Sequence, residues 1–184
     1  MKSFKLSNGM SVVCAGQTKS CSVALSVNVG HVNEPSLAIA NLFERTLLIQ
    51  STGILPIFGG TMTAYTTGGS DIKSMMENLS SIFDVELTEE YLEMAKKAIV
   101  QQTMDTAPLT MRRMKLLYKH TAFGADLVRT TEEYLEAVNS YTLEDVCDFA
   151  RTYYSMSNLR LIVVGDIGFE AVKKMSYDIF DGIP

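Results

Sequence analysis

One stretch decides the fold class: Cys21-Ser22-Val23-Ala24-Leu25-Ser26-Val27-Asn28-Val29. From Val23 onward, every second residue is valine or leucine, and the residues between them are small or polar. Successive side chains of a β-strand point to opposite faces of a sheet, so this period of two predicts a strand with one buried face. The stretch therefore indicates a sheet that packs against other elements on one side.

Further strands are expected on both sides of this stretch. Residues 10–15 follow an Asn8-Gly9 turn, and we expect them to pair with residues 21–29 as a hairpin through the turn at 17–20. Residues 61–67 lie between two glycine pairs and read as a third strand. Leu159–Val164 is an apolar run that Gly165 ends, which is typical of a buried strand.

Apolar residues spaced three and four apart predict helices in the remaining chain. The first is expected from Pro35 to about residue 50, with Leu37, Ala40, Phe43 and Leu47 on its buried face. Capping residues or apolar stripes place further helices at about 71–83, 88–107, 109–123, 131–139 and 143–154, and a final helix carries Val172, Met175 and Ile179. Strands and helices do not alternate strictly. We therefore expect a single α+β domain over residues 1–184, with a mostly antiparallel sheet and helices packed on one face.

Composition narrows the possible partners and location. The 184 residues include 21 acidic and 16 basic ones, and this net charge of −5 argues against nucleic acid and against an anionic membrane surface as partner. No apolar run approaches the roughly 20 residues of a membrane span, and the N-terminal segment lacks the pattern of a signal peptide. Three cysteines without Cys-x-x-Cys spacing indicate reduced thiols and a cytoplasmic protein. A Cys14–Cys21 disulfide across the expected hairpin is the alternative.

Several catalytic motifs are absent from the sequence. It has neither the glycine-rich loops that bind dinucleotides or phosphates nor the Gly-x-Ser-x-Gly elbow of serine hydrolases. The two histidines, His31 and His120, lie 89 residues apart and would share a metal only if the fold joined them. We interpret both as solvated or capping residues.

Five segments nevertheless follow one another in a recognisable order. They are a Leu-x-Asn-Gly turn before a strand at 6–13, a strand and its Gly-x-x-x-Glu turn at 27–34, a helix at 38–45, a Gly-Gly strand at 59–64, and a strand ending Val-Val-Gly-Asp at 158–166. Together they resemble the landmarks of the pitrilysin/insulinase zinc peptidases and of the mitochondrial processing peptidase. The resemblance implies a processing-peptidase-like α+β domain, and it implies assembly, since those enzymes close several such domains around a peptide chamber.

The main departure from the family lies at its zinc site. The family's His-x-x-Glu-His motif would fall on Asn41-Leu42-Phe43-Glu44-Arg45, where only Glu44 matches, and its downstream carboxylate ligand would fall near Gln101 or Gln102. Zinc needs two imidazoles at positions i and i+4 of one helix face, beside a glutamate that deprotonates the bound water. Asn41 is a poor ligand and Arg45 is a permanent cation. We expect Asn41, Glu44 and Arg45 to form a vestigial site, with zinc lost and with no catalytic or cofactor-binding residues.

The resulting hypothesis is a catalytically inactive zinc-peptidase-like protein that acts by assembly. It would form a homodimer, or a heteromer with a related peptidase subunit, and a peptide could add as a strand to an open sheet edge. We expect a strand of the family to be shortened or missing after residue 67, because Gly68-Gly69 leads straight into a helix, and this would leave such an edge. Two alternatives remain open: an active metallopeptidase or other hydrolase with a site rebuilt from His31, Asn41, Glu44 and Arg45, and a structural scaffold subunit.

Overall fold

A mixed six-stranded sheet forms the base of the molecule. The computed structural model describes residues 1–16, 20–30, 32–58, 60–69, 71–105, 114, 118, 121–122 and 130–184. The strands lie in the order β1-β2-β6-β3-β5-β4, and every neighbouring pair is antiparallel except β2 and β6. Their bounds are β1 Lys2–Lys5, β2 Ser11–Ala15, β3 Ser22–Val27, β4 Ile54–Phe58, β5 Thr63–Thr67 and β6 Leu159–Val164. The predicted mostly antiparallel sheet is thus confirmed.

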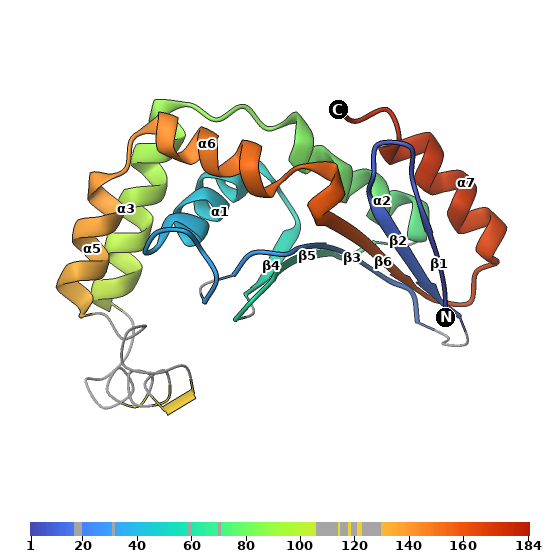
Figure 1. Cartoon of the computed structure of the whole chain (residues 1–184), viewed down its shortest axis with the longest axis horizontal. Coiled ribbons are helices and arrows are strands. Elements are labelled where there is room, and N and C mark those ends of the chain that lie inside the picture. Colours follow the sequence, from blue (N-terminus) through green and yellow to red (C-terminus); the bar gives the residue numbers. More distant parts are fainter. Residues whose placement is uncertain are drawn as a thin grey trace.

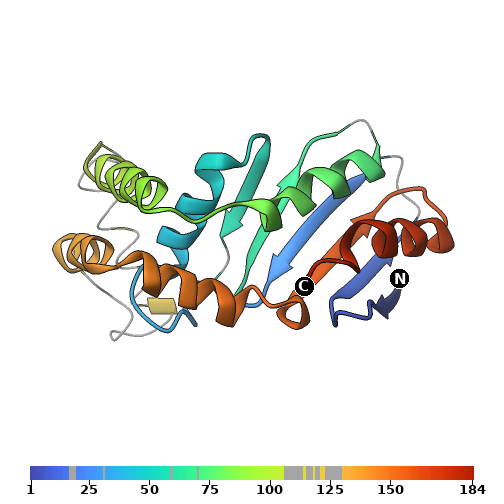
Figure 2. The same ribbon diagram turned by 90° about the horizontal axis from the view of Figure 1, so that it is seen from above.

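The helices form a second layer on one face of this sheet, as Figures 1 and 2 show. α2 packs on β3 and β5, α7 packs on β2, and α1 contacts both α3 and α6. In Figure 1, α3 and α5 stand at one end of the layer. The helical bounds are α1 Ile39–Gln50, α2 Ile72–Ser80, α3 Glu89–Asp105, α5 Thr131–Ser140, α6 Leu143–Tyr153 and α7 Phe169–Phe180. No helix in the described ranges is both long and apolar enough to cross a membrane.

The core lies between the two layers. Val23, Leu25 and Val27 of β3 are fully buried beneath the helices, which confirms the face that the alternating sequence predicted. Leu161 and Val163 of the neighbouring β6 are buried equally. The helices close over these strands with apolar side chains, so the two layers share one contiguous hydrophobic cluster.

Local capping explains where the helices begin. Thr142 and Asp145 form a reciprocal capping box at the start of α6, as their spacing predicts. The start of α1 differs from the prediction. The carboxylate of Glu34 accepts hydrogen bonds from the backbone N–H groups of Ala38 and Ala40, and Ala38 has a left-handed φ of 68°. The helix therefore begins at Ile39 and not at Pro35.

The predicted hairpin between the second and third strands is wrong. β6 lies between β2 and β3 and pairs with both, so these two strands do not touch. The alternative Cys14–Cys21 disulfide fails for the same reason, because Cys14 faces Val163 of β6 and all three cysteines are free. The reason is energetic: β6 is almost wholly apolar, and a central place covers it from both sides.

Two strands were not predicted from the sequence. β1 carries two lysines and β4 contains Pro56, and both features are unfavourable within a strand but tolerated at a sheet edge. Because β4 pairs with β5, no strand is missing beside β5, and the open edge on that side belongs to β4. The expected helix at 109–123 falls almost entirely outside the described residues, as do most of the turn at 17–20 and both histidines.

Candidate functional site

Helix α1 presents the three predicted site residues on neighbouring positions of its surface. Asn41, Glu44 and Arg45 are spaced three and four apart, so their side chains lie on one side of the helix. The guanidinium of Arg45 donates a hydrogen bond through Nη2 to Oε1 of Gln102 on α3. The structure therefore brings Gln102, one of the two positions considered for the downstream ligand, next to α1.

A second polar contact ties α1 to α5. The side-chain amide of Asn41 donates to the hydroxyl of Tyr134 at 2.5 Å. Burial raises the pKa of this tyrosine, and the bond from Asn41 acts against the shift. These two contacts join α1 to α3 and to α5. They use only neutral or cationic groups, those of Asn41, Arg45, Gln102 and Tyr134, with no carboxylate among them.

Glu44 is the most buried member of the group. Its side chain is 1% exposed, and its Oε2 has no hydrogen-bond partner among the described residues. Burial raises the pKa of Glu44 from 4.5 to about 8, while the charge of Arg45 acts in the opposite direction. Near neutral pH the carboxyl of Glu44 is therefore mainly protonated and uncharged. It then does not serve as an anionic partner for Arg45.

Two tyrosines share the interior with Glu44. The hydroxyls of Tyr65 on β5 and Tyr154, which follows α6, are 2.5 Å apart. Burial raises the pKa of both phenols, and the carboxyl of Glu44 adds to each shift. Sequence reasoning did not place Tyr65, Tyr134 or Tyr154 in the site. The one available signal was that a tyrosine at a core position needs a partner for its hydroxyl.

The described side chains do not fit a zinc ion. Arg45 offers only donors, Asn41 offers an amide already bonded to Tyr134, and Gln102 is neutral. The Nε of Arg45 is itself buried without a partner among the described residues, so a cation would lie beside an unneutralised guanidinium. Elsewhere in the described ranges, no three His, Cys, Asp or Glu side chains come close enough to hold a metal.

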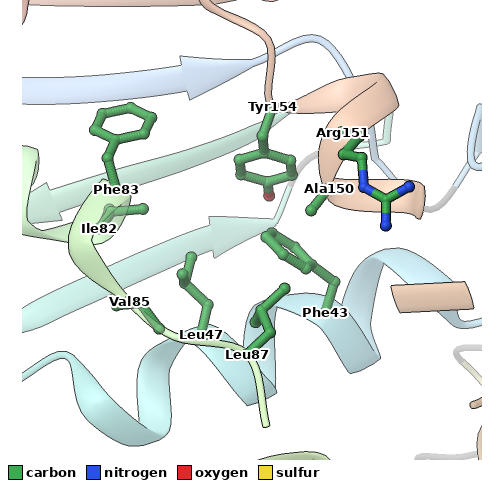
Figure 3. Close-up of a pocket in the computed structure, with 9 residues that line it drawn as sticks. All are labelled: Phe43, Leu47, Ile82, Phe83, Val85, Leu87, Ala150, Arg151 and Tyr154. Atoms are coloured by element: carbon green, nitrogen blue, oxygen red, sulfur yellow. The ribbon is translucent and has the colours of Figure 1, made fainter. Parts of the chain in front are cut away.

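A small apolar pocket opens on another side of α1 (Figure 3). Its volume is about 210 Å³, which suits one side chain better than a whole cofactor. The ring of Phe43 packs 4.4 Å from that of Tyr154, and Arg151, its one charged residue, pairs with Asp148 at 2.6 Å. The lining residues are Phe43, Leu47, Ile82, Phe83, Val85, Leu87, Ala150, Arg151 and Tyr154.

Comparison with solved structures supports the resemblance at the level of fold. The first half of the periplasmic protease PqqL from Escherichia coli matches with a TM-score of 0.80 and 14% identity, over 100% of this chain and 46% of that one. A protease from Helicobacter pylori matches with 0.78 and 18%, over 99% and 50%. An M16-like peptidase from Alicyclobacillus acidocaldarius matches with 0.77 and 18%, over 96% and 48%.

The similarity to these structures covers only part of their length and is not matched by sequence similarity. The chain spans about half the length of those three structures. No protein-family model and no curated protein matches the sequence. At 14–18% identity the likeness concerns the path of the backbone. The chain has the fold of a pitrilysin/insulinase-type peptidase domain.

Proposed function

We propose that residues 1–184 form one peptidase-like domain that has lost zinc-dependent catalysis and acts by assembling with another chain. The observation that carries the proposal is the contact between Arg45 and Gln102. These residues stand where the resemblance places two zinc ligands, and here a guanidinium–amide hydrogen bond joins them. Asn41, at the remaining ligand position, is held by Tyr134.

The state of Glu44 supports the same proposal. In the resembled enzymes this glutamate takes a proton from metal-bound water. A carboxyl with a pKa of about 8 is mostly protonated at pH 7 and accepts a proton poorly. Without a metal to lower the pKa of a bound water, Glu44 has no water molecule acidic enough to deprotonate. Asn41, Glu44 and Arg45 are then a vestigial site with a structural role.

Assembly is the remaining activity that the fold offers. Among the residues that the structure describes, β1 and β4 are the two edge strands of the sheet, and a strand from a peptide or another chain can add to either. Pro56 of β4 has no N–H and would withhold one bond from such a strand. The proposed assembly is a homodimer, or a heteromer with a related peptidase subunit, formed through such an edge. The three free cysteines support a cytoplasmic location.

One experiment tests the loss of zinc directly. The protein is purified without chelators or a histidine tag, incubated with zinc, dialysed and measured by mass spectrometry for metal per chain. We expect close to no zinc in the natural chain. The matched variant Asn41→His/Arg45→His/Gln102→Glu restores the ligand set and is expected to hold about one zinc per chain. Tightly held zinc in the natural chain would overturn the proposal.

A hydrolase with a rebuilt site is the second candidate, because Oε2 of Glu44 is buried without a hydrogen-bond partner in the described part of the chain, a feature found in active sites. This candidate predicts chelator-sensitive cleavage of an unstructured peptide, lost in Glu44→Gln. A scaffold subunit, the third candidate, predicts stable co-purification with a large assembly. Light scattering on the purified chain separates that outcome from a simple dimer.

A further inference from the structure

A group of hydrogen-bond donors lies where α1 meets α3 and α5. α1 and α5 both contact α3, and Figure 1 shows α3 and α5 standing together beside α1. On α1, the side chains of Asn41 and Arg45 are both partly buried. Asn41 donates to Tyr134 of α5, and Arg45 donates to Gln102 of α3. We call Asn41, Arg45 and Tyr134 the donor cluster.

Arg45 has more donors than partners. A guanidinium carries five N–H groups and no acceptor. The structure gives Arg45 one hydrogen bond, from Nη2 to Gln102, and its Nε is buried without a partner among the described residues. Arg45 also belongs to none of the ion pairs formed within the described ranges. A partly buried cation in this state is unfavourable unless an anion joins it.

Tyr134 adds a second donor next to Arg45. Its hydroxyl accepts the hydrogen bond from Asn41, so its own proton is left to donate. The described part of the chain offers no acceptor for that proton. Burial raises the pKa of Tyr134, and the charge of Arg45 is one of the influences that lower it, so the two groups are close enough to interact.

The neighbouring carboxyl groups do not complete this cluster. Glu44 is 1% exposed and accepts no hydrogen bond from Arg45, and burial raises its pKa to about 8, so it carries little charge at neutral pH. The carboxylate of Glu34 accepts from the backbone N–H groups of Ala38 and Ala40 at the start of α1. Among the described residues, the donor cluster therefore has donors and a positive charge but no anion bound to them.

The charge balance of the cluster favours a monoanion as ligand. Arg45 supplies one positive charge, and Asn41 and Tyr134 are neutral. Besides burial, the negative charge of Glu34 raises the pKa of Tyr134, so this carboxylate lies close by and would repel a dianion such as phosphate. A carboxylate carries a single charge, and its two oxygens match the paired N–H groups of a guanidinium.

We propose that the donor cluster binds a carboxylate of a peptide, with the guanidinium of Arg45 as its ionic partner and the hydroxyl of Tyr134 as a further donor. The chemistry is the same for the C-terminus of a peptide and for an acidic side chain. The vestigial site then holds a negative group of a peptide at the place where the resembled enzymes hold a cation. The inference rests on the proposed loss of zinc and adds a ligand for the site.

Nuclear magnetic resonance of the isotope-labelled full chain at neutral pH tests this binding. The Nε–H signal of Arg45 is identified by its loss in Arg45→Lys. Three N-acetylated tripeptides are titrated: trialanine with a free C-terminal carboxylate, trialanine amide, and the same amide with glutamate as its middle residue. We expect the Arg45 signal to shift with a carboxylate peptide, and trialanine amide to bind at least about tenfold more weakly. The peptide that causes the shift identifies the source of the carboxylate.

Substitutions separate the donor cluster from general charge attraction, with the backbone signals of α1 reporting binding. Arg45→Met removes a buried unpaired donor, so it is expected to fold, and it should weaken carboxylate binding at least about tenfold. Asn41→Asp places an anion one turn from Arg45 and should block binding, while Tyr134→Phe should weaken it severalfold. The matched control Arg160→Met removes an exposed arginine of β6 and should leave binding unchanged.

Several results would refute the inference. They are equal shifts with trialanine and its amide, no shift with either carboxylate peptide, and unchanged binding in Arg45→Met. A shift of the Arg45 signal by chloride or phosphate at lower concentration than by the carboxylate peptides would refute it as well. A chain that binds neither zinc nor carboxylate contradicts this inference alone, whereas tightly held zinc overturns the proposed function.

Discussion

Replacing Glu44 by glutamine should change how the stability of the protein depends on pH. Glu44→Gln keeps the shape of the side chain but cannot ionise. In the natural chain the folded state holds a proton on Glu44 up to about pH 8, whereas the unfolded chain releases it near the ordinary value of 4.5. Stability from this residue is therefore highest below pH 4.5 and falls as the pH rises through the window from 4.5 to about 8.

The raised pKa sets the size of the effect. Each pH unit between the two pKa values is worth about 1.4 kcal/mol, so ionising Glu44 in the folded protein costs about 5 kcal/mol in full. At pH 7 only part of the window has been crossed, and the cost is roughly 3 kcal/mol. Relative to the natural chain, the unfolding free energy of Glu44→Gln should rise by roughly 3 kcal/mol between pH 4.5 and pH 7. Between pH 4.5 and pH 9 it should rise by about 5 kcal/mol.

Urea unfolding of both proteins from pH 4.5 to pH 9 measures this difference, provided that the m-values agree. Glu93→Gln is a suitable control, because Glu93 is exposed and the hydrogen bond from Lys96 lowers the pKa of its carboxyl. The stability difference between Glu93→Gln and the natural chain should stay constant from pH 4.5 to pH 9, because its pH-dependent part lies below pH 4.5 and has the opposite sign. A constant difference between Glu44→Gln and the natural chain across the whole range would refute the reasoning, because Glu44 would then be ionised in both states or neither.

Three further substitutions test the packing and the local signals. Leu161→Ala removes a fully buried side chain from the central strand and should cost roughly 2–5 kcal/mol of unfolding free energy, against less than 1 kcal/mol for Met94→Ser. Thr142→Ala removes the acceptor for the Asp145 N–H and should cost about 1 kcal/mol; equal stability would mean that the capping box is inert. Gly9→Ala places a Cβ at a φ of 95° and should lower the melting temperature by several degrees, an effect that Gly182→Ala should not share.

Local signals in the sequence were sufficient for much of the site and the helical layer. The capping box of Thr142 and Asp145 depends on residues three apart, and the shared side of Asn41, Glu44 and Arg45 depends on helical periodicity. Both patterns involve residues within one or two helical turns of each other, so they can be predicted from the local sequence. The approach of Gln102 to α1 was anticipated only through the family resemblance, because no local rule joins residues 57 positions apart.

Features that depend on distant pairing were missed. The insertion of β6 between β2 and β3 has no local signature, since a hairpin is the default for two strands with a short connection. Pro56 hid β4 because the residue disfavours strands, and only the edge position makes it tolerable. Tyr65 and Tyr154 meet near Glu44 from β5 and from the end of α6, so their hydroxyl contact is a property of the completed fold.

The place of β6 has a consequence for the order of events during folding. Residues 160–164 of β6 each pair with one residue of β2 and one of β3, and both partners precede them by more than 130 positions. Closing so long a loop delays the productive contacts and slows folding relative to a sheet built from hairpins. On the ribosome, the two N-terminal strands emerge long before the strand that separates them. Until residues 159–164 arrive, β2 and β3 each present an unpaired edge, and this nascent stage is when the chain is most exposed to wrong pairing with its neighbours.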